Sequence, residues 1–257
     1  MPYDGVGTEM EIREPERLTP VVGEADVVVV GSGPGGLSAA IAAARAGVSV
    51  ILIERFGCFG GNITSVGVEG FAWYRHEKTI EAGGLTFEYE QRAIENNAAV
   101  PESQSKSYEL DSEGFKVVAD NLVLKAGVRP MLHRAFCSPI LEGNEIRGVI
   151  TESKAGREAI MGKIIVDATG DADVARRSGV TVFKNSKEDM ISASVMFHMS
   201  GVNKEEFMDE IKRDPQKYSD WSDKNWQAQT SGKEDDMFSP FLRKPFEKAK
   251  ESGLIDS

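Results

Sequence analysis

The chain has 257 residues, of which 40% are hydrophobic, and a net charge of −11 at pH 7, so it can bury a substantial core but offers no basic surface for nucleic acid. No apolar run approaches the roughly 20 residues that a membrane helix needs, which predicts a chain without a membrane span. The two cysteines, Cys58 and Cys137, make neither a disulfide framework nor a thiolate metal cluster, and we expect no metal site.

Residues 1–24 are polar and interrupted by prolines, which favours a lead-in segment laid over the surface. The start Met1-Pro-Tyr-Asp-Gly-Val has no signal-peptide pattern, so we expect a cytoplasmic protein.

A strand, a glycine turn, a helix and a second strand follow one another in residues 26–54. The run Asp26-Val-Val-Val-Val30 predicts a buried strand because its β-branched residues are consecutive. The alanine-rich run over residues 37–46 predicts a helix, which Gly47 closes. Residues 48–53 predict the second strand.

The glycine spacing between the first strand and the helix has a specific physical meaning. Gly31 allows a tight turn, Gly33 lets backbone approach a diphosphate, and Gly36 lets helix and strand pack closely. Glu54 ends the second strand, where a carboxylate can accept hydrogen bonds from a ribose diol and would repel a 2′-phosphate. An ordinary glycine turn would not need all these features together, so the pattern predicts a dinucleotide site.

A second glycine-rich run, Arg55-Phe-Gly-Cys-Phe-Gly-Gly-Asn62, follows directly. With it, the chain resembles the FAD-dependent oxidoreductases of the glutathione-reductase-like superfamily, in particular the family with a single nucleotide-binding domain. The matching stretches are residues 25–47, 53–55 and 60–61. The resemblance implies that the glycines cradle the FAD diphosphate, the acid binds the adenosine ribose and the Gly-Gly loop passes along the flavin side. The residues in these implied roles are Gly31, Gly33, Pro34, Gly36, Glu54, Arg55, Gly60, Gly61 and Asn62.

Disulfide reductases of this superfamily carry a Cys-x4-Cys pair just after the Gly-Gly. Asn62 and Ile63 occupy that place here, and no cysteine follows until Cys137. We therefore expect no thiol-disulfide chemistry and interpret Cys58 as a small packing residue.

Residues 63–110 contain a helical run near Phe87 to Ile94. Arg75 and His76 are candidates for charge recognition or proton transfer, because a flavoenzyme of this build places substrate contacts in this part of the chain. A solvated basic pair on a loop is the alternative.

The next fifty residues predict one helix followed by strands. Asp111 caps an amphipathic helix that extends to Ala126, and Gly127 ends it. A short strand over residues 128–133 is followed by a β-meander with strands over 135–141, 145–152 and 157–160. The family resemblance implies a backbone contact with the FAD adenine near Phe136.

Residues 163–171 carry a third signature. A buried strand leads to Ala168-Thr-Gly170, which in the resembling family returns the chain beside the cofactor. The resemblance implies cofactor contacts for Thr169, Gly170 and Asp171, and this signature favours FAD over NAD. A short helix over residues 171–177, closed by Gly179, should follow.

The character of the chain changes beyond residue 180. Residues 191–200 alternate between apolar and polar and predict a strand of a substrate-facing sheet, with His198 on its polar face as a second acid or base candidate. Asn203 should cap a helix that extends to about Arg213. The charged remainder suits a cap or a partner surface.

We therefore expect an α/β protein: a Rossmann-like parallel FAD-binding sheet with a β-meander, plus part of a mixed-sheet substrate domain. The expected parts are a lead-in segment (1–24), an FAD-binding domain (25–180, with a substrate-side insertion over 63–110) and a partial substrate or cap domain (181–257).

The predicted activity is hydride transfer between a small organic substrate and flavin, with His76 or His198 managing protons. No second Gly-x-Gly-x-x-Gly occurs, so reoxidation requires an electron acceptor or a partner subunit. Chains of the resembling family normally continue further and return to the flavin. One alternative is therefore a partner-dependent or non-catalytic nucleotide-binding subunit. A second is an NAD-binding oxidoreductase, which Glu54 permits, and an oligomeric assembly is also possible.

Overall fold

The computed structural model describes residues 12–13, 15–70, 75–76, 80–81, 83–101 and 108–186, and beyond these 189–190, 195, 200–203, 205–206, 209 and 248–254. His198 and most of the strand predicted over residues 191–200 lie outside these ranges. At the start of the next predicted helix, Asn203 Oδ1 accepts hydrogen bonds from the backbone N–H groups of Glu205 and Glu206, at 3.1 and 3.3 Å. The predicted capping contact of Asn203 is therefore confirmed.

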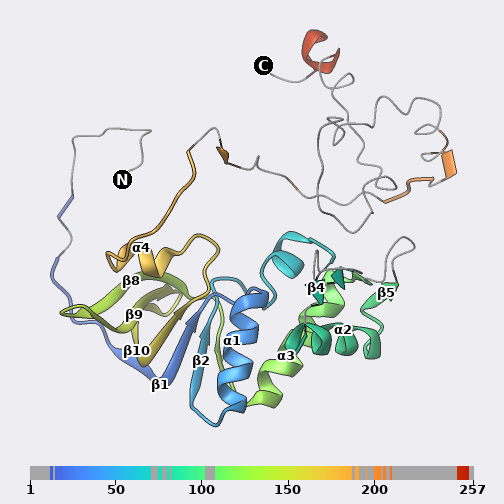
Figure 1. Cartoon of the computed structure of the whole chain (residues 1–257). Coiled ribbons are helices and arrows are strands. Elements are labelled where there is room, and N and C mark those ends of the chain that lie inside the picture. The colour runs from blue at the N-terminus through green and yellow to red at the C-terminus, as the bar shows by residue number, and fades with distance from the viewer. Residues whose placement is uncertain are drawn as a thin grey trace.

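A six-stranded sheet forms the centre of the molecule, in the order β7-β2-β1-β10-β9-β8 (Figure 1). Its strands are β1 (Val21–Val30), β2 (Val50–Ile53), β7 (Arg129–Met131), β8 (Ala135–Glu142), β9 (Glu145–Ser153) and β10 (Gly156–Asp167). The first four in the order are parallel, whereas β9 and β8 continue from β10 as antiparallel neighbours. The predicted α/β class, with a Rossmann-like parallel sheet and a β-meander, is confirmed.

Two strands are longer than the sequence predicts. β1 begins at Val21 rather than at Asp26, because Val21 already pairs with Ala159 of β10. The two strands predicted over 157–160 and 163–167 form the single strand β10, which pairs with β1 along most of its length. Gly162 lies within it, and a Cβ there would approach Val28 Cγ2 to 2.7 Å. The glycine therefore lets the two strands pack closely and does not mark a break.

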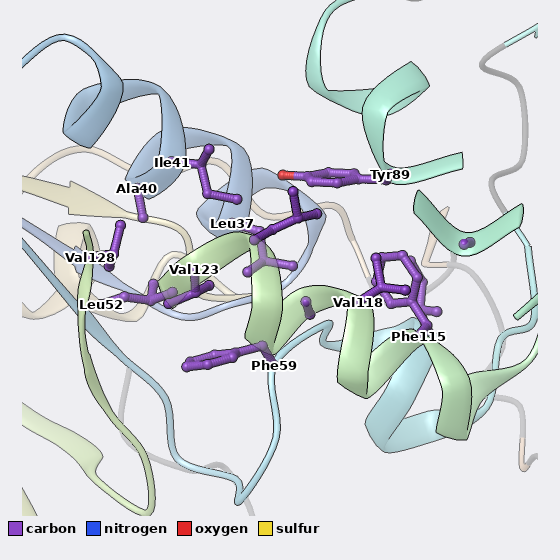
Figure 2. Packing of buried hydrophobic residues seen from close by; sticks show 14 of the residues in the cluster. Leu37, Ala40, Ile41, Leu52, Phe59, Tyr89, Phe115, Val118, Val123 and Val128 are labelled. Atoms are coloured by element: carbon purple, nitrogen blue, oxygen red, sulfur yellow. The ribbon is translucent and has the colours of Figure 1, made fainter. Parts of the chain in front are cut away.

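Helices cover one face of the parallel strands. α1 (Pro34–Arg45) and α3 (Ser112–Ala126) lie against this face, and α2 (Leu85–Glu95) packs farther out (Figure 1). Side chains from all three helices meet β1 and β2 in one apolar cluster (Figure 2), whose members include Val29, Leu37, Ile41, Leu52, Tyr89, Phe115, Val118 and Val123. α2 contains the helical run predicted from Phe87 to Ile94.

A second cluster lies on the opposite face, where α4 (Asp173–Arg177) packs its Val174. Val28 and Val30 point to this face, whereas Val29 points to the other. Both faces of β1 are therefore buried, which explains why its sequence is continuously apolar rather than alternating.

Smaller elements fill the insertion between β2 and α3. They are the π-helix η1 (Asn62–Val66), the antiparallel pair β3 (Arg75–His76) and β4 (Ile80–Glu81), and the antiparallel pair β5 (Ala99–Pro101) and β6 (Tyr108–Leu110). Asp111 caps α3 by accepting a 2.7 Å hydrogen bond from the backbone N–H of Gly114, as predicted. Within the ranges given above, no helix is both long and apolar enough to cross a membrane.

Candidate functional site

The first glycine turn joins β1 to α1 through contacts that leave no room for side chains. Gly31 has a φ of +95°, and a Cβ on it would lie 2.5 Å from the Ala168 carbonyl oxygen. A Cβ on Gly36 would lie 1.9 Å from the Gly31 carbonyl oxygen. The tight turn at Gly31 and the close helix–strand approach at Gly36 are therefore present as the glycine spacing predicts.

Gly33 differs from these two glycines. It precedes α1 with φ −61° and ψ 176°, a conformation open to any residue, and no heavy atom of the described residues lies within 4 Å of the position that its Cβ would take. Among the residues that the structure describes, no side chain caps the helix. Its first turn carries no acidic residue, and Pro34 occupies its first position. The N-terminus of α1 therefore offers free backbone N–H groups and the positive end of the helix dipole to an anion.

The second glycine segment lies directly on the first. The backbone N–H of Gly60 donates to the Ser32 carbonyl oxygen at 2.9 Å. Gly61, with φ +56° and ψ −123°, would place a Cβ 2.7 Å from Gly33 Cα. Asn62 then begins η1. Gly60 and Gly61 therefore pack against the turn that leads into the N-terminus of α1.

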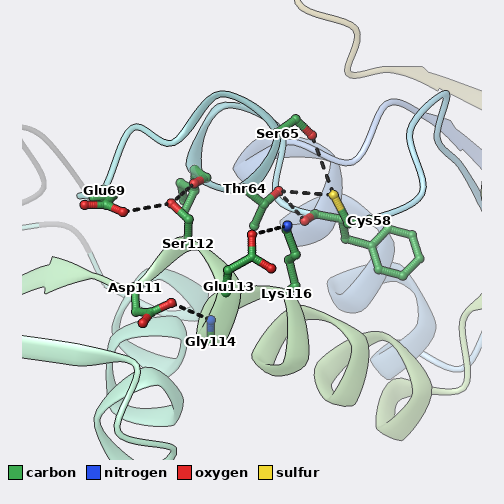
Figure 3. A network of polar contacts seen from close by, with 11 residues as sticks. Cys58, Thr64, Ser65, Glu69, Asp111, Ser112, Glu113, Gly114 and Lys116 are labelled. Carbon is green, nitrogen blue, oxygen red and sulfur yellow. Dashed lines mark hydrogen bonds and ion pairs between the residues drawn. The ribbon is translucent and has the colours of Figure 1, made fainter. Parts of the chain in front are cut away.

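A network of polar contacts holds this second segment on α3 (Figure 3). Ser112 Oγ, at the start of α3, donates to the Ile63 carbonyl oxygen at 2.8 Å. Thr64 Oγ1 donates to the Phe59 carbonyl oxygen at 2.6 Å, and Cys58 Sγ lies 3.9 Å from Thr64 Oγ1. Cys58 is half-buried in these contacts, which suits its predicted packing role.

Glu54 is buried beside the first turn, with 6% of its surface exposed. Its Oε2 accepts hydrogen bonds from the backbone N–H of Ser32, at 2.9 Å, and from Ser32 Oγ, at 2.6 Å. Its Oε1 accepts from the backbone N–H of Phe56 at 2.9 Å. A carboxylate has about four acceptor positions, so roughly one remains for a ligand.

The third glycine-containing segment, residues 168–170, packs against the first turn. The backbone N–H of Ala168 donates to the Val30 carbonyl oxygen at 2.9 Å, and the Ala168 carbonyl is the group that a side chain on Gly31 would strike. All three glycine-containing segments therefore meet at the carboxyl end of β1.

Within the third segment, Thr169 serves the turn into α4. Its Oγ1 donates to Asp167 Oδ1 at 2.6 Å and accepts from the backbone N–H of Asp173 at 2.8 Å. Gly170 and Asp171 are exposed, and a Cβ on Gly170 would meet no heavy atom within 4 Å. Gly170 and Asp171 are thus the two predicted contacts of this segment that face outward.

Sequence reasoning missed Asp167, which organises this turn. Its Oδ1 accepts from the backbone N–H and the hydroxyl of Thr169, and its Oδ2 accepts from the backbone N–H of Ala175 in α4. An aspartate a few residues before a short helix is a recognisable capping signal that could have found it.

The chain after β7 runs beside Glu54. The backbone N–H of Arg134 donates to the Glu54 carbonyl oxygen at 2.9 Å, and that of His133 donates to the Phe56 carbonyl oxygen at 3.0 Å. A Cβ on Gly57 would lie 2.6 Å from the His133 ring, so His133 packs here against backbone.

Two further predicted cofactor contacts, Arg55 and Phe136, lie near this segment. The Arg55 guanidinium stacks over the Phe56 ring, 4.6 Å from its centroid. Phe136, half-buried in β8, lies under the Arg177 guanidinium at 5.6 Å. Phe136 follows Arg134 by two residues, so its strand starts from the Glu54 side of the site.

The side chains of the two histidine candidates lie outside what the structure describes. His76 pairs through its backbone with Ile80 in the β3–β4 hairpin, and His198 lies outside the described ranges. Among the residues that are placed, no group of three His, Cys, Asp or Glu side chains could hold a metal ion.

Comparisons with known proteins find a matching family and partial relatives. The sequence model of the family described as FAD dependent oxidoreductase matches residues 26–253. Thiamine thiazole synthases of Saccharolobus islandicus and Saccharolobus solfataricus are each 33% identical over 162 residues, which cover 59% of this chain and 57% of theirs. The chain thus spans little more than half the length of these curated relatives.

Among solved structures, THI4 of Thermovibrio ammonificans has a TM-score of 0.47 and 21% identity, covering 62% of this chain and 64% of that one. A geranylgeranyl bacteriochlorophyll reductase-like protein of Thermoplasma acidophilum has a TM-score of 0.48 and 20% identity, covering 62% and 42%.

Proposed function

The chain belongs to the FAD-dependent oxidoreductase family, and from this premise we propose that its glycine segments bind the adenosine and diphosphate half of FAD in an enzyme that transfers a hydride between a small organic substrate and flavin. FAD is the cofactor of this family. The hydride-transfer reaction and the residue roles below are our proposal.

One observation carries the proposal: the open space at Gly33. At Gly31 and Gly36, neighbouring backbone leaves no room for a side chain. At Gly33, the backbone conformation suits any residue and no described heavy atom lies within 4 Å of a Cβ, so the fold itself does not explain the glycine. An anion that approaches the N-terminus of α1 would explain it, because a side chain there would keep the ligand away from the free N–H groups. Gly33 therefore fits the diphosphate of FAD.

Different residues of the chain would then contact different parts of FAD. The N-terminus of α1 and the Gly60–Gly61 backbone would face the diphosphate, and the remaining acceptor position of Glu54 would take a ribose hydroxyl. The backbone near Phe136 would lie along the adenine, while Gly170 and Asp171 would face the cofactor from the third segment. When bound, the flavin supplies a ring that accepts and returns hydride.

Proton transfer and reoxidation lie outside this binding half. We assign proton transfer to His76 or His198 and reoxidation to an electron acceptor or partner subunit, since the sequence holds a single Gly-x-Gly-x-x-Gly. Because the chain spans 57% of its curated relatives, a further polypeptide segment that completes the active site is part of this proposal.

The test is an absorbance spectrum of the purified 257-residue chain, followed by mass spectrometry of the molecules released on denaturation. Flavin absorbance together with released FAD is the expected result. A colourless chain that also takes up no added FAD would contradict the proposal. Released NAD would support an NAD-binding oxidoreductase, which Glu54 also suits.

The curated relatives make a synthase the second candidate, because the 33% identity extends over 162 residues of this chain. An adenine nucleotide other than FAD or NAD, released from a chain that does not take up FAD, would favour this second candidate.

A further inference from the structure

Ser32, which lies between Gly31 and Gly33 in the first glycine turn, makes two contacts to which the glycine pattern assigns no role. It is fully buried, and both its backbone N–H and its hydroxyl donate to the same oxygen of Glu54, at 2.9 and 2.6 Å. The shorter contact lies in the range of hydrogen bonds between a hydroxyl and a carboxylate, which are about twice as strong as neutral ones.

Glu54 needs these donors because it is a buried carboxylate. Its surface is 6% exposed, and the part of the chain that the structure describes offers it no ion pair. Its charge is balanced by three hydrogen bonds, two of them from Ser32 and one from the Phe56 backbone. A buried carboxylate that loses a donor lowers the stability of the fold, because its desolvation is then less compensated.

We propose that Ser32 is a positioning residue that fixes the Glu54 carboxylate so that its remaining acceptor position selects a ribose hydroxyl. This inference rests on the proposed adenosine site. Oε2 is occupied twice by Ser32 and Oε1 once by Phe56, so the remaining position is on Oε1. The serine hydroxyl is the only side-chain donor among these three and therefore the one that a substitution can remove without changing backbone.

The test measures selectivity for the ribose rather than overall affinity. The full 257-residue chain, stripped of bound nucleotide, is titrated calorimetrically with ADP, 2′-deoxy-ADP and 3′-deoxy-ADP. For the native chain we expect at least one deoxy analogue to bind about tenfold more weakly than ADP, because it lacks a hydrogen bond to a charged group. In Ser32→Ala the same penalty should fall to about threefold or less.

Two further variants keep the result interpretable. Ser38→Ala is the matched control, since Ser38 lies on α1 but its hydroxyl contacts the Pro34 carbonyl and Tyr89. It should keep the native penalty of about tenfold. Ser32→Cys replaces the hydroxyl by a weak donor of similar shape and should also lose selectivity for the ribose. It is the variant to measure if Ser32→Ala does not fold.

The outcomes separate this inference from the proposed function. If folded Ser32 variants bind ADP more weakly but keep the native penalty, Ser32 has only a structural role and the inference is overturned, while the adenosine site stands. If the native chain binds ADP without distinguishing either deoxy analogue, the inference is overturned and a diphosphate site remains. A native chain that binds no ADP overturns both.

Discussion

The glycine turns and the insertion before α3 are built in opposite ways. Where residues 31–36, 60–61 and 168–170 meet, backbone lies against backbone, and the space is set by side chains that are missing. In the insertion, α2 is attached to the rest of the molecule by side chains. Tyr89 fills the core (Figure 2), its hydroxyl bonds Ser38, and Glu88 pairs with Arg45. In the first arrangement a side chain at Gly31, Gly36 or Gly61 would strike neighbouring backbone, whereas the second spreads its stability over several replaceable contacts.

The largest effect should come from filling the space at Gly36. In Gly36→Ala the new Cβ would lie 1.9 Å from the Gly31 carbonyl oxygen, so α1 must move away from β1. We expect a loss of about 3 kcal/mol or more in the free energy of unfolding, at the upper end of overpacking effects. Urea denaturation of the purified chain measures this loss.

Gly35→Ala is the matched control for that experiment. A Cβ on Gly35 would meet no heavy atom within 4 Å, and its φ is not positive. Since alanine is a better helix former, this variant should be as stable as the native chain or more stable by up to about 1 kcal/mol. Equal stabilities of the two variants would refute the idea that the turn is held by backbone contact.

Gly33→Ala should separate the needs of the ligand from those of the fold. Because its Cβ would enter open space, we expect unfolding free energy to change by about 1 kcal/mol or less. FAD should bind at least about tenfold more weakly, because the methyl group holds the diphosphate away from the helix N-terminus. Calorimetric titration with FAD measures this, and native affinity in a stable variant would argue against a diphosphate at Gly33.

The same contrast explains how much the sequence could predict. The strand, turn and helix around Gly31 and Gly36 were predictable because only glycine satisfies those positions, and a required glycine is visible in one sequence. The capping of α3 by Asp111 was predictable because the donor, the Gly114 N–H, lies only three residues away.

Contacts between distant segments were not predictable in this way. The bond between Ser32 and Glu54 and the side-by-side course of Gly60 and Ser32 join residues more than twenty positions apart. Likewise, the sequence predicts separate strands over 157–160 and 163–167, yet pairing with β1 joins them into the continuous strand β10. Local patterns report local geometry, whereas these features depend on tertiary packing.

In the insertion, Tyr89→Phe should have an intermediate effect. Tyr89 is 1% exposed, and its hydroxyl lies 3.0 Å from Ser38 Oγ. Losing this hydrogen bond should lower the unfolding free energy by about 1 kcal/mol at neutral pH. Chemical denaturation of both proteins measures the difference, and no change at neutral pH would show that this bond does not help to attach α2.

The difference in unfolding free energy between the native chain and Tyr89→Phe should also depend on pH. Burial raises the pKa of the Tyr89 hydroxyl above its ordinary value of 10.0. The unfolded chain therefore ionises first as pH rises, so the native stability is fully present below pH 10.0 and falls above it. The phenylalanine variant lacks this loss, and its stability deficit should shrink above about pH 10. A deficit that stays constant with pH would contradict the assignment of the raised pKa to Tyr89.

The smallest effect should come from the ion pair that joins α1 to α2. The Arg45 guanidinium meets the Glu88 carboxylate with two hydrogen bonds of 2.7 and 2.8 Å, but the side chains are 46% and 24% exposed. Solvent screening therefore limits the coupling to about 0.5 kcal/mol, within the range of exposed pairs. A double-mutant cycle with Arg45→Ala and Glu88→Ala measures it.

The pH dependence of this cycle follows from Glu88. Its hydrogen bonds from Arg45 lower the pKa of the Glu88 carboxyl, so the coupling is present above the ordinary value of 4.5 and is lost as pH falls through the lowered one. We expect the coupling to weaken as pH falls below 4.5 and to be weaker in high salt. A coupling well above 1 kcal/mol at pH 7 would show that α2 is attached as rigidly as the glycine turns are, and the contrast between the two regions would fail.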